Sequence, residues 1–188
     1  MVIPWTLLLI ICVILILIIV FVVTTYNGLI KLRNNVQNSW AQIDVELQRR
    51  FDLIPNLVET VQGYVKHEES VLVKVTELRS AWSSSKSIAD KAKLDNELSK
   101  AFKSISVIAE AYPDLKSNSN FLSLQNELSN TETKISSSRA NYNNIVAIYN
   151  TKLEIFPNNL VGSMFRFKPE EFFKLDNEEV KQNIKVSF

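Results

Sequence analysis

The sequence predicts an all-α protein: an N-terminal transmembrane helix continuous with an antiparallel up-down four-helix bundle, followed by a short C-terminal tail. Three observations lead to this prediction. An uncharged apolar run opens the chain, apolar residues recur every three or four positions through most of the remainder, and glycine and proline are scarce. The 188 residues include 3 glycines and 5 prolines, which favours long helices over many short strands.

The apolar run covers residues 2–23 and is interrupted only by Pro4 and Thr6, and the first charged side chain is Lys31. At 1.5 Å per helical residue, residues 5–23 would span roughly 28 Å, which is close to the hydrocarbon thickness of a bilayer. The run therefore predicts a helix that crosses a membrane once.

A cleaved signal peptide is the main alternative to an anchor. Signal peptides combine a positive N-terminal region, an apolar stretch of about 7–15 residues and a small-residue cleavage site. The apolar run here is longer, and residues 21–25 contain no A-x-A pattern. We therefore expect residues 1–25 to remain attached as a transmembrane anchor, with the single cysteine, Cys12, as an apolar side chain facing lipid.

The distribution of basic residues predicts the orientation of the anchor. Lys31 and Arg33 follow the apolar run closely, whereas only the terminal amine precedes it. By the positive-inside rule, this favours a short N-terminus outside the cell and a cytoplasmic body. A single cysteine excludes an intramolecular disulfide, which fits a reducing compartment.

Helical periodicity predicts four helices in a bundle domain over residues 26–159. The first stripe is formed by Leu29, Leu32, Val36, Trp40, Ile43 and Leu47, at the three- and four-residue steps typical of an amphipathic helix. Serine-rich, proline-containing and Phe-Pro-Asn segments separate the later stripes. The expected helices cover about 26–51, 53–83, 88–112 and 118–155, and matched lengths with short loops suit an antiparallel bundle.

Two interpretations are open at Pro55. Asp52 can cap a new helix whose first turn tolerates proline, which would make a tight reversal. Alternatively, one helix continues with a kink, because Ile54, Val58 and Val61 extend the preceding apolar phase. We expect the reversal.

Residues 160–188 form an amphipathic tail of different character. Residues 164–168 alternate apolar and basic side chains, and Phe172 and Phe173 follow. These aromatic and basic residues could touch the lipid headgroups, or the phenylalanines could fill a groove on the bundle. We favour the groove.

Composition and motifs argue against several classes of function. Net charge is +1, from 21 basic and 20 acidic residues, so the chain lacks the basic excess typical of nucleic-acid binding. Gly28, Gly63 and Gly162 are isolated, which excludes a glycine-rich phosphate loop. His67 is the only histidine, and a zinc site of the H-E-x-x-H type needs two. We therefore expect no catalytic, cofactor-binding or metal-binding residues, and no enzymatic activity.

The remaining hypotheses concern interactions. The leading one is a membrane-anchored scaffold that self-assembles and organises or remodels the membrane, with lipid and further copies of the chain as partners. The alternative is a membrane-tethered adaptor or sensor that binds an unidentified soluble partner or ligand. The candidate oligomer contacts are Leu29, Val36 and Trp40, and the candidate interaction surface is Arg49, Arg50, Asp52, Asn56, Glu59 and His67.

Several ordered motifs give the chain a resemblance to a known family. They are YNGLIKLRNNV at 26–36, WAQIDVEL at 40–47, RRFDLIPNLVETV at 49–61, AEAYPDLK at 109–116, LQNEL at 124–128 and FPN at 156–158. In this combination the sequence resembles the LemA family from the anchor to about residue 173.

The resemblance implies a single-span protein of the bacterial cell (inner) membrane with a cytoplasmic four-helix bundle. It implies no enzymatic activity and no cofactor, and it supports both the outside N-terminus and a reversal at Pro55. One branch of the LemA family belongs to magnetosome membranes and is tied to the formation of membrane compartments.

Overall fold

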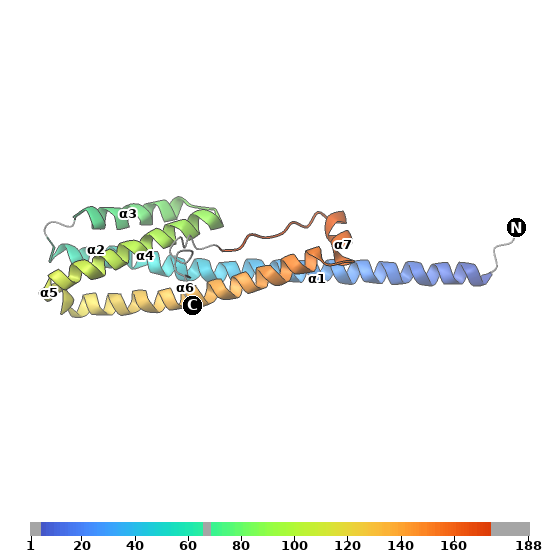
Figure 1. Ribbon diagram of the computed structural model, residues 1–188, viewed down its shortest axis with the longest axis horizontal. Coiled ribbons are helices and arrows are strands. Elements are labelled where there is room, and N and C mark those ends of the chain that lie inside the picture. The colour runs from blue at the N-terminus through green and yellow to red at the C-terminus, as the bar shows by residue number, and fades with distance from the viewer. Residues whose placement is uncertain (1–4, 66–68, 174–188) are drawn as a thin grey trace, which may run out of the picture. The chain divides into compact units, whose positions relative to one another are not determined.

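The computed structural model describes residues 5–65 and 69–173, and within these ranges every regular element is a helix (Figure 1). The all-α prediction is therefore confirmed. The helices are α1 (Trp5–Asp52), α2 (Ile54–Gln62), α3 (Glu69–Ser84), α4 (Ile88–Ala111), α5 (Pro113–Lys116), α6 (Ser119–Glu154) and α7 (Asn158–Met164).

The chain divides into two compact units. Unit 1 contains residues 5–41 and 141–172, and unit 2 contains residues 42–140 together with Phe173. Helices α1 and α6 each contribute residues to both units.

The N-terminal part of α1 has the features expected of a membrane span. Helix α1 is continuous over 48 residues, so the apolar run continues into the body without a break. With the exception of Val22, the large apolar side chains between Leu7 and Val23 are 36–64% exposed. By its length and composition, this helix is apolar and long enough to cross a bilayer.

Burial in unit 1 begins where the apolar run ends. Thr25 is 7% exposed and Leu29 is fully buried, and Val36 continues the same stripe of α1. At the end of this stripe, the ring of Trp40 on α1 meets the ring of Tyr142 on α6 edge-on, with 5.9 Å between centroids. The helical periodicity of α1 thus serves packing within the chain once the helix passes Thr25.

The segment after α7 is fastened to α6 by hydrogen bonds. The hydroxyl of Tyr142 donates to the carbonyl of Glu171 (2.8 Å), and that of Tyr149 donates to the carbonyl of Lys168 (3.0 Å). The Asn150 side chain accepts from the Glu170 N–H and donates to the Glu170 carbonyl, both at 2.9 Å. These contacts satisfy backbone groups in a segment that is neither helix nor strand.

The aromatic residues of the tail are divided between buried and exposed positions. Phe173 is 3% exposed and Phe167 is half-buried, whereas Phe165 and Phe172 are 46% and 43% exposed. Groove filling therefore accounts for only part of the tail, and residues 174–188 lie outside the described residues.

Unit 2 is a helical bundle with four antiparallel arms. The first arm is the end of α1 followed by α2, and the others are α3, α4 and the part of α6 up to Ala140, with α3 and α4 side by side (Figure 1). Its core includes the stacked rings of Phe51 and Trp82, whose centroids are 4.6 Å apart. Ser87 caps α4 by accepting a hydrogen bond from the Asp90 N–H, as serine does at many helix starts.

The chain kinks at Pro55 and does not reverse there, so the expected reversal is wrong. Leu53 keeps a right-handed helical conformation, and its carbonyl accepts from the Leu57 N–H at 3.0 Å. Pro55 lies in the first turn of α2, where a missing N–H costs nothing. The apolar face continues across the kink, because Phe51 before it and Ile54 after it are both 1% exposed.

The reversal lies between α2 and α3 instead. The sequence indicated one helix over 53–83, whereas the described residues form two helices, and Gly63 ends α2. Glycine lowers helix propensity by about 1 kcal/mol relative to alanine, which favours an end at this position.

We predict that Tyr142→Phe changes how stability depends on pH. Burial, and then Glu170 and Glu171, raise the pKa of Tyr142 from 10 to about 12. A raised pKa stabilises the folded state below the unfolded-state pKa, and this contribution is lost as pH rises from about 10 to 12. The free energy of unfolding of the wild type, relative to that of the variant, should therefore fall by about 2–3 kcal/mol in that window.

The measurement is the free energy of unfolding in detergent at pH 9 and pH 11.5, for both proteins. A difference between wild type and variant that is the same at both pH values would contradict the prediction.

Candidate functional site

Four charged side chains from three helices meet inside unit 2. Arg50 of α1, Asp95 of α4 and Arg139 of α6 are 3%, 0% and 9% exposed. The Nη1 atom of Arg50 lies 2.6 Å from Oδ1 of Asp95, and Arg139 pairs with the other carboxylate oxygen of Asp95. Arg50 also pairs with the half-exposed Glu132 of α6. We call these four residues the charge cluster.

Electrostatics show that burying the two arginines is costly. Burial lowers the pKa of Arg50, while Glu132 acts in the opposite direction. Burial, and then the charge of Arg50, lower the pKa of Arg139 to about 10. Because a desolvated cation is unfavourable unless it is paired, the carboxylates of Asp95 and Glu132 are what keep both guanidinium groups charged inside the fold.

Two aromatic rings complete the surroundings of the arginines. The guanidinium carbon of Arg50 lies 5.3 Å from the ring centroid of Phe102, and that of Arg139 lies 4.5 Å from that of Phe173. Cation–π contacts of this kind contribute roughly 0.5–2 kcal/mol, with the larger values at desolvated sites.

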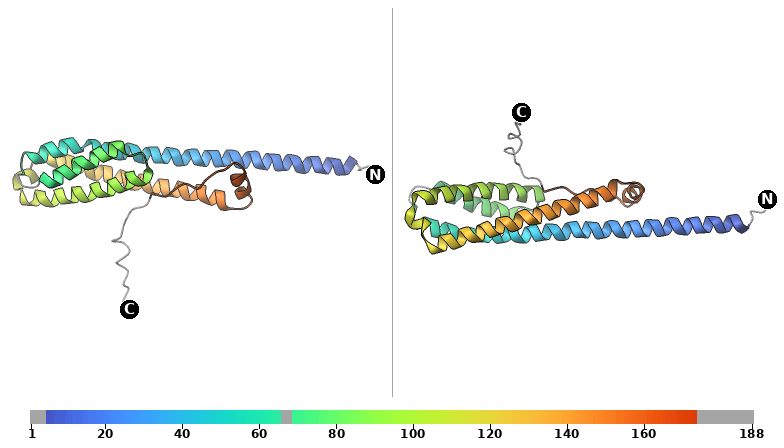
Figure 2. Two further views of the ribbon diagram at one scale, coloured as in Figure 1. Left: turned by 90° about the horizontal axis from the view of Figure 1, so that it is seen from above. Right: turned by 60° about the horizontal axis from the view of Figure 1, so that its bottom comes forward.

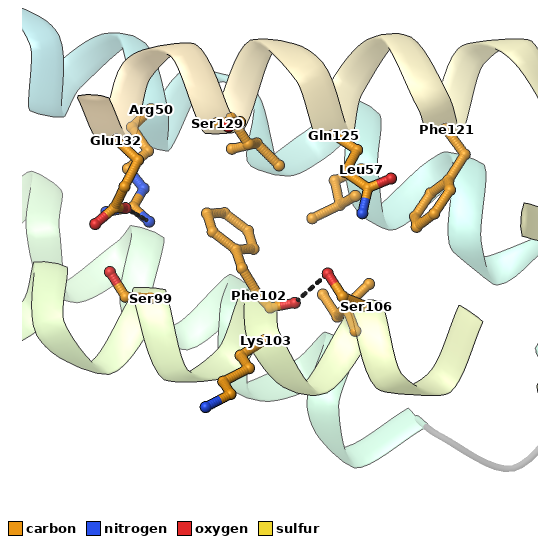
Figure 3. A pocket seen from close by; sticks show the side chains of 12 residues that line it. Arg50, Leu57, Ser99, Phe102, Lys103, Ser106, Phe121, Gln125, Ser129 and Glu132 are labelled. Carbon is orange, nitrogen blue, oxygen red and sulfur yellow. Dashed lines mark hydrogen bonds and ion pairs between the residues drawn. The ribbon is translucent and has the colours of Figure 1, made fainter. Parts of the chain in front are cut away.

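A cavity of about 390 Å³ opens beside the charge cluster (Figure 3). Arg50 and Glu132 lie at one end, and Phe121 and Gln125 lie toward the other. Apolar side chains of several helices and three serines, Ser99, Ser106 and Ser129, contribute to its lining. An apolar cavity with a few polar groups at its margin is the usual form of a small-molecule site, so this space fits a small amphiphilic ligand.

The residues of the predicted interaction surface lie in different surroundings in the structure. Arg49 is exposed and pairs with Glu127, and Asp52 accepts a hydrogen bond from Gln48. Arg50 is buried in the charge cluster and is therefore not a surface residue.

The other members of that prediction lie elsewhere. Asn56 and Glu59 line a second, polar cleft of about 570 Å³. At this cleft, Asn118 donates a hydrogen bond to the hydroxyl of Tyr64 at 2.9 Å. His67 lies outside the described residues.

The predicted oligomer contacts pack inside unit 1. Leu29 and Val36 are 0% and 3% exposed, and Trp40 is half-buried against Tyr142. A second copy of the chain cannot reach Leu29 or Val36 while unit 1 is folded, because neighbouring parts of the same chain cover them.

Asp95, Glu132 and Arg139 were not predicted as site residues from the sequence, which placed Arg50 on an exposed interaction surface. A signal for Asp95 was present, since it lies three residues after Ala92 and three before Leu98, both of which are buried. Arg139 likewise lies between Ile135 and Tyr142 on a buried stripe. A charge at a stripe position indicates a buried ion pair, although the sequence does not name its partner.

We predict that Asp95→Asn strongly destabilises the protein, by about 3–5 kcal/mol, because it leaves two buried cations without their shared anion. The matched control is Glu97→Gln on the same helix. It breaks the 3.3 Å ion pair with Lys74, whose two side chains are 54% and 37% exposed, and exposed pairs contribute less than about 1 kcal/mol.

Chemical denaturation of the full-length protein in detergent measures both effects. If the two variants lose similar stability, Asp95 does not have the role assigned to it here.

Comparison with known proteins places this fold in a family. The sequence model of the LemA family matches residues 39–188. Protein LemA of Metamycoplasma hominis is 29% identical over 139 residues, a region that covers 72% of this chain and 63% of that relative. The matched region thus spans less than two thirds of the relative's length. The family match extends from the first helix through the charge cluster, and the chain belongs to the LemA family.

Proposed function

We propose that this protein is a single-pass, membrane-anchored scaffold without enzymatic activity, which self-assembles at the membrane and organises or remodels it. The observation that carries the proposal is the uncovered apolar stretch of α1, joined without a break to a folded helical body. Removing such a stretch from water is strongly favourable, at about 25 cal/mol per Å² of apolar surface.

The proposed topology places the N-terminus outside the cell and the helical body in the cytoplasm, with α1 in the bacterial cell membrane. Its support is the pair Lys31 and Arg33, which follow the apolar stretch on the body side. Basic residues close to a span are retained on the cytoplasmic side.

Confinement of the anchored chains to the membrane favours the proposed self-assembly. Anchors hold copies of the chain in one plane, which raises their effective concentration. Because Leu29 and Val36 are buried, lateral contacts need other side chains. Val45 is 66% exposed and lies on α1, the helix that also carries the anchor, so we propose Val45 as a contact between neighbouring copies.

We predict that the triple variant Ile11→Asp, Ile14→Asp and Ile18→Asp leaves the membrane fraction. An aspartate near the centre of a span costs about 3 kcal/mol, so three of them offset most of the gain from the apolar residues. Alkaline carbonate washing of membranes measures the retained fraction, and protease added to intact or opened cells reports the side on which the body lies. Wild type found in the soluble fraction would overturn the anchoring proposal.

We also predict that the detergent-solubilised, full-length protein forms a large, regular particle, and that Val45→Glu reduces its size without changing helical content. Light scattering with electron imaging measures both. The matched control is Val107→Glu on α4, because Val107 is also 66% exposed and should leave the size unchanged. A monomeric wild type would reject the scaffold proposal.

The cavity beside the charge cluster favours a second function, that of an adaptor or sensor. Its lining of apolar groups and serines, with Arg50 and Glu132 at one end, suits a small amphiphilic ligand. The adaptor would be supported over the scaffold by two results together. The protein would be a monomer that such a ligand stabilises, and Ser129→Trp, which fills the cavity, would abolish this stabilisation.

A further inference from the structure

We propose that the exposed apolar residues around α7 form a second membrane contact, inserted into the interface of the bilayer that α1 crosses. These residues, Ile155, Phe156, Leu160, Met164 and Phe165, are called the α7 patch below. The inference rests on the proposed anchoring by α1 and adds a surface to it.

The α7 patch is unusually exposed for its composition. Its five members are 45%, 77%, 61%, 61% and 46% exposed, in chain order. They lie within eleven consecutive residues, which run from the end of α6 along α7, so five exposed apolar side chains are concentrated in one short segment. Contiguous exposed apolar surface of this kind marks a site of interaction with a protein or a membrane.

One face of α7 is held firmly while the opposite face is free. Asn158, Val161 and Gly162 are buried, and a side chain at Gly162 would lie 3.0 Å from Cδ2 of Leu153 on α6. Leu160 and Met164, four residues apart on the helix, share the exposed face. The exposed side chains are therefore displayed by a fixed element that already packs on its other side.

The position of the α7 patch along α1 identifies its partner. The ring of Phe165 lies 4.7 Å from the ring of Tyr26, centroid to centroid, and both views in Figure 2 show α7 beside α1. Tyr26 follows Val23, the last residue of the apolar run, by three positions, or roughly 4.5 Å along the helix. A bilayer crossed by α1 therefore has its interface at the level of α7.

The chemistry of this region suits a lipid interface. Phenylalanine, leucine and methionine side chains enter the boundary between headgroups and acyl chains, to a depth of about 5–10 Å. Exposed charges of both signs surround the α7 patch, among them Arg166, Lys168 and Glu154. Because these charges are mixed, apolar burial rather than attraction to anionic lipid drives the contact, and neutral phosphatidylcholine is sufficient.

Three single-cysteine proteins test the inference in the full-length chain. The wild type carries Cys12 within the apolar run. The other two combine Cys12→Ser with Leu160→Cys or with Ile148→Cys. Ile148 is the matched control, because it is 49% exposed on α6 and lies seven residues, or roughly 10 Å along a helix, before Ile155. Each thiol is labelled with an environment-sensitive fluorophore, and each protein is placed in phosphatidylcholine vesicles.

Quenching by spin-labelled lipid is compared with quenching by iodide present on both sides of the membrane. A probe at position 160 should be quenched by lipid labelled near the headgroup and show about half, or less, of the iodide quenching seen at position 148. Raising the salt concentration should leave this difference unchanged. Circular dichroism of each labelled protein confirms that the helices are intact.

The outcomes separate the two proposals. If the probe at Cys12 is not quenched by lipid labelled deep in the acyl chains, the anchoring proposal fails. If Cys12 is quenched but positions 160 and 148 are equally open to iodide, the anchoring proposal stands and the α7 contact is wrong. Stronger headgroup-level quenching at 160 than at 148 supports the contact.

Discussion

The pairing of one buried carboxylate with two buried arginines is the constraint on which the helical bundle of unit 2 depends. Asp95 is fully buried and joins Arg50 of α1 to Arg139 of α6, while Glu132 supplies the second negative charge. Apolar packing tolerates small shifts of one helix against another. A shift that separates a buried ion pair is costly, because it leaves a buried charge without its partner. The charge cluster therefore favours one alignment of α1, α4 and α6, and it also sets one end of the neighbouring cavity.

Helix α1 uses one continuous backbone for two different environments. Up to Val23 its apolar side chains point outward on all sides, which suits lipid, and from Thr25 onward a stripe of apolar side chains is covered by protein. The α7 patch lies at the change between the two environments, where Tyr26 meets Phe165. The proposed scaffold role and the proposed membrane contact both depend on this change occurring without a break in the helix.

Two local patterns in the sequence, the motif around Pro55 and the apolar stripe of α1, are each compatible with more than one structure. The motif around Pro55 is compatible with a reversal or with a kink, because proline is tolerated in the first turn of either arrangement. The decision depended on burial: Phe51, Ile54, Leu57 and Val61 form one continuous buried face across the kink. Similarly, Leu29 and Val36 have the spacing of an oligomer seam, yet the stripe that they form is covered by their own chain.

The sequence by itself determined the helical class, the apolar segment and the family, since these depend on composition, local periodicity and ordered motifs that act within one helix. It did not determine which charges pair, because Asp95 and Arg50 are 45 residues apart and no local pattern specifies a partner at that separation. The cavity, the kink at Pro55 and the exposure of the α7 patch were decided only by tertiary structure. Each of them depends on which neighbour covers a given helix face, and that is a property of the packed chain.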